Sequence, residues 1–176
     1  MSEIKRIGVL TGGGDCSGLN AVVRAVTLTA INKYGCEVIG FKKGYAGLYA
    51  NNYMQLTAEN TTNILNQGGT ILKNSNKDNL FNYAYRDENG NIQHKDVSDV
   101  AIQILKDLQI DALVVIGGDG TLTSARDFAR KGVRVIGVPK TIDNDLMVTD
   151  HTPGYGSAAK FVATTLKEVI CDTMKM

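Results

Sequence analysis

The sequence predicts a doubly wound α/β domain, with a mainly parallel sheet and helices on both of its faces. Short apolar runs alternate along the chain with segments whose apolar residues recur at helical spacing, which is typical of this fold class. The run at 112–116, ALVVI, is entirely apolar and largely β-branched, as expected for a strand buried on both faces of a parallel sheet. No repeat or low-complexity linker interrupts the pattern, so we expect one domain over residues 1–176.

The first half of the chain begins with a strand–helix–strand unit. We expect a strand at 7–10, a helix over 19–31, a strand at 37–41 and a helix over 57–67. Gly35 suits the end of the first helix, and Thr57 suits the N-cap of the second, which Gly68 follows. Residues 73–96 are polar and weakly periodic, which indicates a functional loop or a small hairpin.

The second half continues the alternation of helices and strands. We expect a helix from Ser98 to Leu108, a strand at 112–116, a helix over 122–131, a strand at 133–138, a loop at 139–146 and a final helix over 157–174. Ser98 is expected to cap the first of these helices, and Gly132 follows the second.

Composition narrows the class of protein. The net charge of +1 provides no broad field for nucleic acid or an anionic membrane, so any bound anion needs a local site. The three cysteines are an odd number without CxxC spacing, which argues against a disulfide framework or a zinc site and favours a reducing compartment. No window resembles a signal peptide or a membrane span, so we expect a cytoplasmic protein.

Three loops are expected at one edge of the sheet, where the carboxyl ends of parallel strands meet. They are TGGGDCSG at 11–18, GGDGT at 117–121 and PKTIDND at 139–145. Glycines let backbone N–H groups approach an anion closely, and a helix N-terminus adds partial positive charge. The pattern favours a phosphate cradle built from Gly13, Gly14, Gly118 and Gly120. Each loop taken alone is also compatible with a plain turn, and none matches the dinucleotide or P-loop pattern.

Three carboxylates lie beside these glycines. A bare negative charge suits a phosphate cradle poorly unless a divalent cation intervenes, so Asp119 is interpreted as a Mg²⁺ ligand, direct or through water. Asp143 and Asp145 are two residues apart and would point to one side of an extended loop, where one could act as a general base. The alternative is that these aspartates cap turns.

Five motifs together resemble the N-terminal half of the 6-phosphofructokinases. They are RIGVLTGGGDCSGLNAVVRAV, GYAGLY, QGGTIL, ALVVIGGDGTLTSA and GVPKTIDNDL, and they cover nearly the whole chain in the family's order. NAD kinases and diacylglycerol kinases also carry GGDGT, but PKTIDND separates this chain from them. The resemblance implies transfer of the γ-phosphoryl group of ATP to the 1-hydroxyl of fructose 6-phosphate.

The resemblance also implies roles for individual residues. Asp143 is similar to the family's base, Asp119 to its Mg²⁺ ligand, and Thr141 and Asp145 to substrate or phosphate contacts. The expected nucleotide contacts are Gly13, Gly14, Lys77, Gly118, Gly120, Thr121 and Lys140. Lys77 lies next to a position where many ATP-using members carry an arginine, and the alternative is that it is a solvated loop charge.

Two residues bear on the phosphoryl donor, which is ATP or pyrophosphate in this family. Pyrophosphate-specific members commonly carry Asp where this chain has Gly120, and that carboxylate would fill and repel the α-phosphate space. Lys140 favours pyrophosphate instead, because many ATP users have Gly there. We expect ATP, because a steric and electrostatic block is harder to evade than an extra lysine is to tolerate.

Members of this family are about twice as long as this chain. The resemblance therefore implies that a sugar-phosphate half, which begins near an MGR segment, is missing after residue 176, and that 1–176 alone is nearly inactive. It also implies a dimer or tetramer. A non-catalytic nucleotide-binding fragment is the alternative, but the presence of both Asp119 and Asp143 favours the enzyme.

Overall fold

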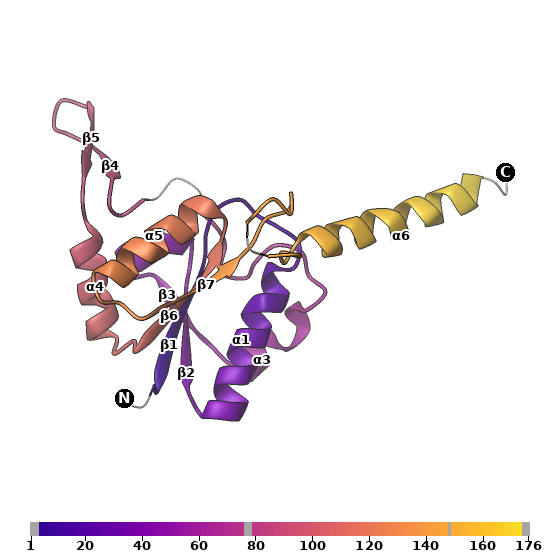
Figure 1. Cartoon of the computed structure of the whole chain (residues 1–176), viewed down its shortest axis with the longest axis horizontal. Helices are drawn as coiled ribbons and strands as arrows, with labels where there is room; N and C mark the ends of the chain where they lie inside the picture. Colours follow the sequence, from indigo (N-terminus) through magenta and orange to yellow (C-terminus); the bar gives the residue numbers. More distant parts are fainter. Residues whose placement is uncertain (1–3, 76–78, 148, 174–176) are drawn as a thin grey trace.

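The computed structural model describes residues 4–75, 79–147 and 149–173. Its centre is a five-stranded sheet in the order β3-β2-β1-β6-β7 (Figure 1). The strands are β1 Arg6–Thr11, β2 Glu37–Phe41, β3 Tyr53–Leu56, β6 Ala112–Gly117 and β7 Val135–Pro139. All neighbours pair in parallel except β2 and β3, which are antiparallel. The predicted α/β class and mainly parallel sheet are confirmed.

Helices cover both faces of the sheet (Figure 1). One face carries α1 Leu19–Tyr34, α3 Ala58–Thr61 and the 3-10 turn η1 Thr62–Ile64; the other carries α2 Gly44–Tyr49, α4 Ser98–Asp107 and α5 Asp119–Arg130. Alternate strand residues face opposite sides, so Val9 packs under α1 while Leu10 packs under α4 and α5. The sheet therefore separates two apolar cores.

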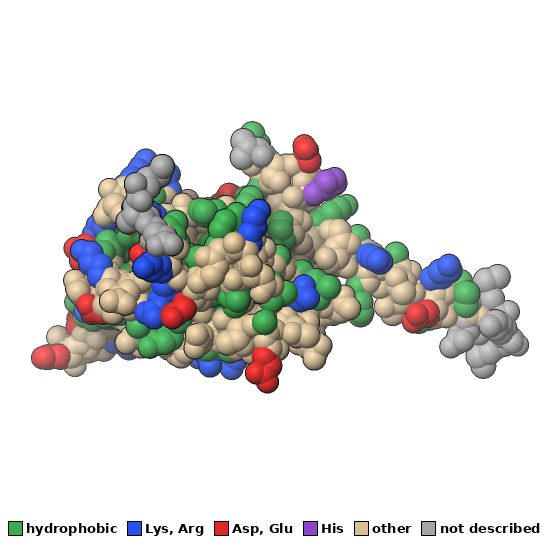
Figure 2. Space-filling view, turned by 90° about the horizontal axis from the view of Figure 1, so that it is seen from below, with side chains coloured by type: hydrophobic (Ala, Val, Ile, Leu, Met, Phe, Trp, Pro, Cys, Tyr) green, Lys and Arg blue, Asp and Glu red, His purple; other side chains and the backbone are tan. Residues whose placement is uncertain are grey.

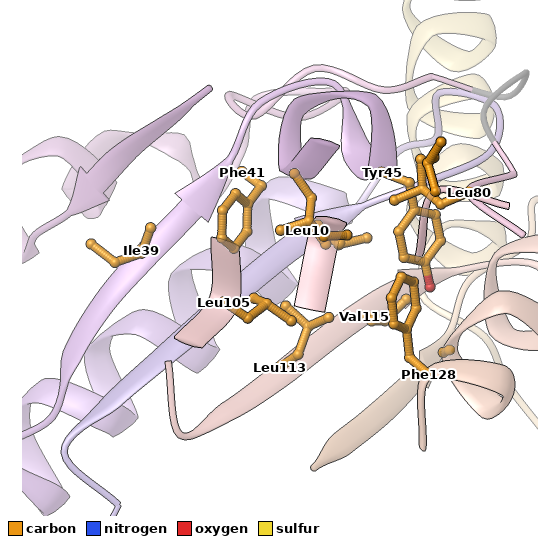
Figure 3. Packing of buried hydrophobic residues seen from close by; sticks show 13 residues of the cluster. Leu10, Ile39, Phe41, Tyr45, Leu80, Leu105, Leu113, Val115 and Phe128 are labelled. Carbon is orange, nitrogen blue, oxygen red and sulfur yellow. The ribbon is translucent and has the colours of Figure 1, made fainter. Parts of the chain in front are cut away.

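The core beneath α4 and α5 is rich in aromatic rings (Figure 3). The rings of Tyr45 and Phe128 stack with their centroids 5.6 Å apart, and Phe81 meets Phe128 edge-on at 4.9 Å. Each fully buried side chain of this size contributes about 1.5–3 kcal/mol relative to exposure. This packing anchors α5, whose N-terminus lies at the carboxyl edge of the sheet.

The polar segment at 73–96 contains the small hairpin that was one of the two predictions for it. Its strands are β4 Tyr83–Arg86 and β5 Ile92–Lys95, and the hairpin projects from the body of the molecule (Figure 1). The Asp87 carboxylate accepts hydrogen bonds from two backbone N–H groups of the connecting turn, and Gly90 supplies a positive φ of 82°.

The helix α6 Tyr155–Thr173 leaves the body of the molecule and runs outward (Figure 1). Hydrophobic side chains lie along this arm in the space-filling view (Figure 2). Phe161 is 73% exposed, and Leu166 and Val169 are more than half exposed. The apolar stripe that predicted this helix thus has no core to face in the described part of the chain. No helix there is long and apolar enough to cross a membrane.

Several predicted helix boundaries are wrong, and the final helix begins at Tyr155 rather than at 157. The helix expected over 122–131 begins at Asp119, with Gly118 as its N-cap. The helix expected over 57–67 has the predicted cap at Thr57 but ends with η1 at Ile64. Ser98 is not a cap: it is the first residue of α4, and its N–H and hydroxyl both donate to the carboxylate of Asp96.

The short elements α2 and β3 were not predicted; for α2 the reason is that glycines usually weaken helices. In α2 the glycines serve close approach instead. A Cβ on Gly47 would lie 1.6 Å from the carbonyl oxygen of Lys42, and one on Gly44 would lie 2.8 Å from that of Thr11. The absence of these side chains lets α2 pack directly against the ends of β1 and β2.

Candidate active site

The three predicted loops converge at the carboxyl ends of β1, β6 and β7. They line a cavity of about 490 Å³. All predicted site residues except one line it: Gly13, Gly14, Gly118, Asp119, Gly120, Thr121, Lys140, Thr141, Asp143 and Asp145. The exception, Lys77, lies outside the described residues.

Strand register brings the loops together. The N–H of Gly12 donates to the carbonyl of Ile116 at 2.9 Å, and the N–H of Lys140 donates to that of Gly117 at 2.9 Å. A Cβ on Gly12 or Gly117 would lie 2.6 Å from the side chain of Thr121. Both glycines are therefore needed to accommodate that side chain, which is buried and packs between the first two loops.

The glycines of the first loop differ in what they offer a ligand. Gly13 has a φ of 80°, and its N–H donates to the carbonyl of Ser75 at 3.1 Å. The N–H of Gly13 is thus already used within the protein. A Cβ on Gly14 would meet nothing within 4 Å, so this glycine borders open space. Gly14 is the better placed of the two for contact with an anion.

The second loop leads directly into α5, whose first turn borders the cavity. Asp119 is the first residue of the helix and is exposed, and Gly120 follows it with open space where its Cβ would be. The hydroxyl of Tyr45 donates to the carbonyl of Thr121 at 3.0 Å and ties this turn to α2. Burial raises the pKa of the Tyr45 phenol, which keeps it a neutral donor.

The third loop does not have the extended form expected for it. Asn144 has a left-handed φ of 53°, so the chain turns between Asp143 and Asp145. The hydroxyl of Thr141 donates to the Asp145 carboxylate at 2.9 Å and accepts the N–H of Asp143 at 3.2 Å. Both carboxylates still line the cavity. Among the described residues none donates a hydrogen bond to the Asp143 carboxylate.

Lys140 joins the first and third loops. Its side chain is only 5% exposed, and its ammonium donates to the carbonyl of Gly14 at 2.7 Å. Cys16 lies nearby and is buried; burial raises the pKa of its thiol, although the charge of Lys140 acts in the opposite direction. Cys16 is therefore held as a thiol at neutral pH rather than as a reactive thiolate.

Several cavity residues were missed by the sequence reasoning. Tyr45, Ser75, Asn79 and Ser124 line the cavity from outside the three loops. Tyr45 lies in the motif GYAGLY and Ser124 in ALVVIGGDGTLTSA, whereas Ser75 and Asn79 lie in none of the five motifs. Within the part of the chain that the structure describes, no group of three His, Cys, Asp or Glu side chains is arranged to hold a metal ion by itself.

An open parallel sheet with glycine-rich loops and a helix N-terminus at its carboxyl edge defines the class of phosphate-binding α/β domains. The family model for phosphofructokinase matches residues 6–175, and the chain therefore belongs to the phosphofructokinase family.

Among the relatives, some are named for ATP as the phosphoryl donor and one for pyrophosphate. The chain is 64% identical to ATP-dependent 6-phosphofructokinase 2 of Clostridium perfringens, over 94% of this chain and 45% of that protein. It is 44% identical to pyrophosphate–fructose 6-phosphate 1-phosphotransferase of Dictyoglomus thermophilum, over 93% of this chain and 44% of that protein. The chain thus spans less than half the length of these relatives.

Solved structures give the same fold. The crystal structure of Pichia pastoris phosphofructokinase in the T-state superposes with a TM-score of 0.73 at 32% identity. The match covers 88% of this chain and 17% of that one. The resemblance to the phosphofructokinases stated from the motifs is confirmed by the family model, the named relatives and the solved structure.

Proposed function

We propose that the full-length protein transfers the γ-phosphoryl group of MgATP to the 1-hydroxyl of fructose 6-phosphate, and that this chain supplies the nucleotide side and the base. The observation that carries the proposal is the convergence of three loops on one cavity, with the N-terminus of α5 and the Asp143 carboxylate both facing it. Phosphoryl transfer depends mainly on positioning and charge neutralisation, which such a site can provide.

The phosphates of the donor would lie against Gly14 and the first turn of α5. Both places leave open space beside the backbone, and the helix N-terminus favours negative charge. Lys140 contributes a buried positive charge at the same place. This arrangement accounts for glycine at positions where a side chain would occupy the phosphate space.

Mg²⁺ fits the carboxylate of Asp119. The ion prefers oxygen ligands and is commonly held by one or two carboxylates together with water and substrate phosphates, so a three-residue protein cluster is not required. Asp119 is exposed at the edge of the cavity, where phosphates would complete the set. When bound, the ion neutralises charge on the phosphoryl oxygens.

Asp143 is the proposed general base. Its carboxylate lines the cavity and accepts no hydrogen bond from the described residues, so it is available to the 1-hydroxyl of the sugar phosphate. Asp145 is engaged by the hydroxyl of Thr141, which suits a residue that shapes the loop or contacts substrate. The alternative that both aspartates merely cap turns accounts for Asp145 better than for Asp143.

ATP is the proposed donor. The open space at Gly120 leaves room for phosphates beyond the two of pyrophosphate, and the 64% identical relative is named as ATP-dependent. The ammonium of Lys140 donates a hydrogen bond to the carbonyl of Gly14. Because this contact already gives the lysine a role within the protein, its presence argues less strongly for pyrophosphate as the donor. Pyrophosphate dependence is the second candidate, because a 44% identical relative carries it in its name.

The experiment is a donor assay on the full-length gene product. Fructose 1,6-bisphosphate formation is measured with ATP or pyrophosphate, with and without Mg²⁺, for the wild type and for Asp143→Asn. We expect turnover with MgATP and a loss of kcat on the order of 10²–10⁴ in the variant, with similar KM for ATP. Turnover with pyrophosphate but not with ATP would overturn the assignment of ATP as donor. An unchanged kcat in Asp143→Asn would overturn the assignment of Asp143 as the base.

The cytoplasm is the proposed location, supported by the three free cysteines, two of them buried. A homo-oligomer is proposed from the family resemblance. Sedimentation of the full-length protein tests the second proposal, and a monomer at micromolar concentration would overturn it.

A further inference from the structure

Asn144 stands between the two aspartates of the third loop and has the most unusual backbone of that loop. Its φ of 53° lies in the left-handed region, which Asn and Gly tolerate and most other residues avoid. The turn at this residue lets Asp143 and Asp145 both line the cavity from a folded rather than an extended loop. A residue that fixes this turn thereby fixes where two carboxylates point.

The side-chain amide of Asn144 bridges two parts of the loop. Its Oδ1 accepts the N–H of Thr152 at 2.9 Å, and its Nδ2 donates to the carbonyl of Asp150 at 3.1 Å. A backbone N–H can only donate and a carbonyl can only accept, so one orientation of the amide satisfies both partners. The amide therefore acts as a directional clasp across the loop.

The other end of this clasp is anchored in the body of the protein. Thr152 is 5% exposed, and its hydroxyl donates to the carbonyl of Thr141 at 2.8 Å. Thr141 forms a β-bridge with Gly154, which packs against Cys16 in the first loop. The chain of contacts runs from the glycine loop through Thr152 to Asn144.

We propose that Asn144 is a positioning residue for phosphoryl transfer: its amide holds the loop in the one turn that presents the Asp143 carboxylate to the sugar hydroxyl. This inference rests on the proposed function, because it takes Asp143 as the base. A loop without this amide would sample other conformations and would have to find the productive turn again in each catalytic cycle. Small errors in the placement of a base are costly to rate.

Two substitutions at this position distinguish the effect of the left-handed backbone turn from the effect of the side-chain hydrogen bonds. Asn144→Gly keeps access to the left-handed turn and removes the amide. Asn144→Asp keeps the size and the acceptor for the Thr152 N–H but loses the donor to the Asp150 carbonyl. Asn51→Gly is the matched control, because Asn51 is exposed, has a φ of 52° and lies outside the cavity.

The measurements are made on the full-length gene product. We expect Asn144→Gly to lower kcat on the order of 10²-fold, with the KM for ATP within about twofold of the wild type, and Asn144→Asp to lie between the two. In an Asp143→Asn background the Asn144→Gly change should add little, because both act through one carboxylate. Equal rates for Asn144→Gly and Asn51→Gly, or full additivity with Asp143→Asn, would overturn the inference.

The contact itself can be tested without activity. Amide hydrogen exchange at Thr152 should be protected in the wild type and should accelerate at least tenfold in Asn144→Gly, while Asn51→Gly leaves it unchanged. A wild type without fructose 6-phosphate turnover would refute the proposed function. Unchanged exchange at Thr152 would refute the clasp, and the two failures are thus distinguishable.

Discussion

A carboxylate placed at position 120 tests the proposed donor directly. Gly120 is the second residue of α5, is exposed, and borders the cavity. A Cβ there meets nothing within 4 Å, and the backbone is not in the left-handed region, so Gly120→Asp can enter without moving the chain. Acidic residues in the first turn of a helix are stabilising, so we expect the variant to unfold at a temperature no lower than the wild type.

The expected cost to ATP follows from Coulomb's law. A new carboxylate about 6 Å from one phosphate charge, at an effective dielectric constant of about 20, raises the energy of the bound nucleotide by about 2.8 kcal/mol. Such a penalty corresponds to a loss of about 100-fold in kcat/KM for ATP. Salt reduces it, so the loss should shrink as ionic strength rises.

Gly120→Asn is the matched control, because it adds nearly the same volume without charge. Steady-state rates with varied ATP and saturating fructose 6-phosphate are compared for the full-length wild type and both variants. We expect a loss of less than about 10-fold for Asn and about 100-fold for Asp. Equal losses in the two variants would show that electrostatic repulsion of phosphates does not act at this position, and the assignment of Gly120 would be wrong.

Three further substitutions test contacts that stabilise the folded chain. Tyr45→Phe removes the buried hydrogen bond to the Thr121 carbonyl and should lower the free energy of unfolding by about 1 kcal/mol in urea titrations; an unchanged midpoint would contradict this. Gly154→Ala would place a methyl group 2.1 Å from a buried sulfur at a φ of 120°, so its melting temperature should fall by several degrees, whereas Gly156→Ala, with open space, should not change it. The pKa of Asp111 is lowered because its carboxylate accepts two backbone N–H groups next to β1, so its stabilisation is present above about pH 4 and is lost as the pH falls through its folded pKa. The difference in melting temperature from Asp111→Ala should therefore shrink as the pH is lowered below about 4, and a difference that stays constant would refute this reasoning.

The strands β1, β2 and β6 were predictable because burial on both faces leaves an unambiguous apolar pattern. Every residue of β6 is buried, and the run ALVVI marks it in the sequence. The meeting of the three loops was also predictable, since parallel strands must end at one edge. Local sequence preferences and the tertiary structure agree at these places.

The errors arise where tertiary contacts override local preference. Gly120 lies in the first turn of α5 despite its low helix propensity, because Gly118 caps the helix and Tyr45 holds its start. The partner of the Lys140 ammonium lies across the cavity in another loop and leaves no signal in the sequence. Asn144 gave no signal either, because its left-handed turn depends on partners six and eight residues further along the chain.

The parallel pairing of β1 with β6 has a thermodynamic consequence for ligands. The N–H of Gly12 and the carbonyl of Ile116 are hydrogen-bonded although more than half of the chain separates them in sequence. The cavity therefore exists only in the globally folded state, and no local segment can retain it after unfolding. A ligand at 100 times its dissociation constant should then protect the whole domain by about 2.7 kcal/mol. Thermal denaturation thus becomes a binding assay, able to rank nucleotides and pyrophosphate before any turnover is measured.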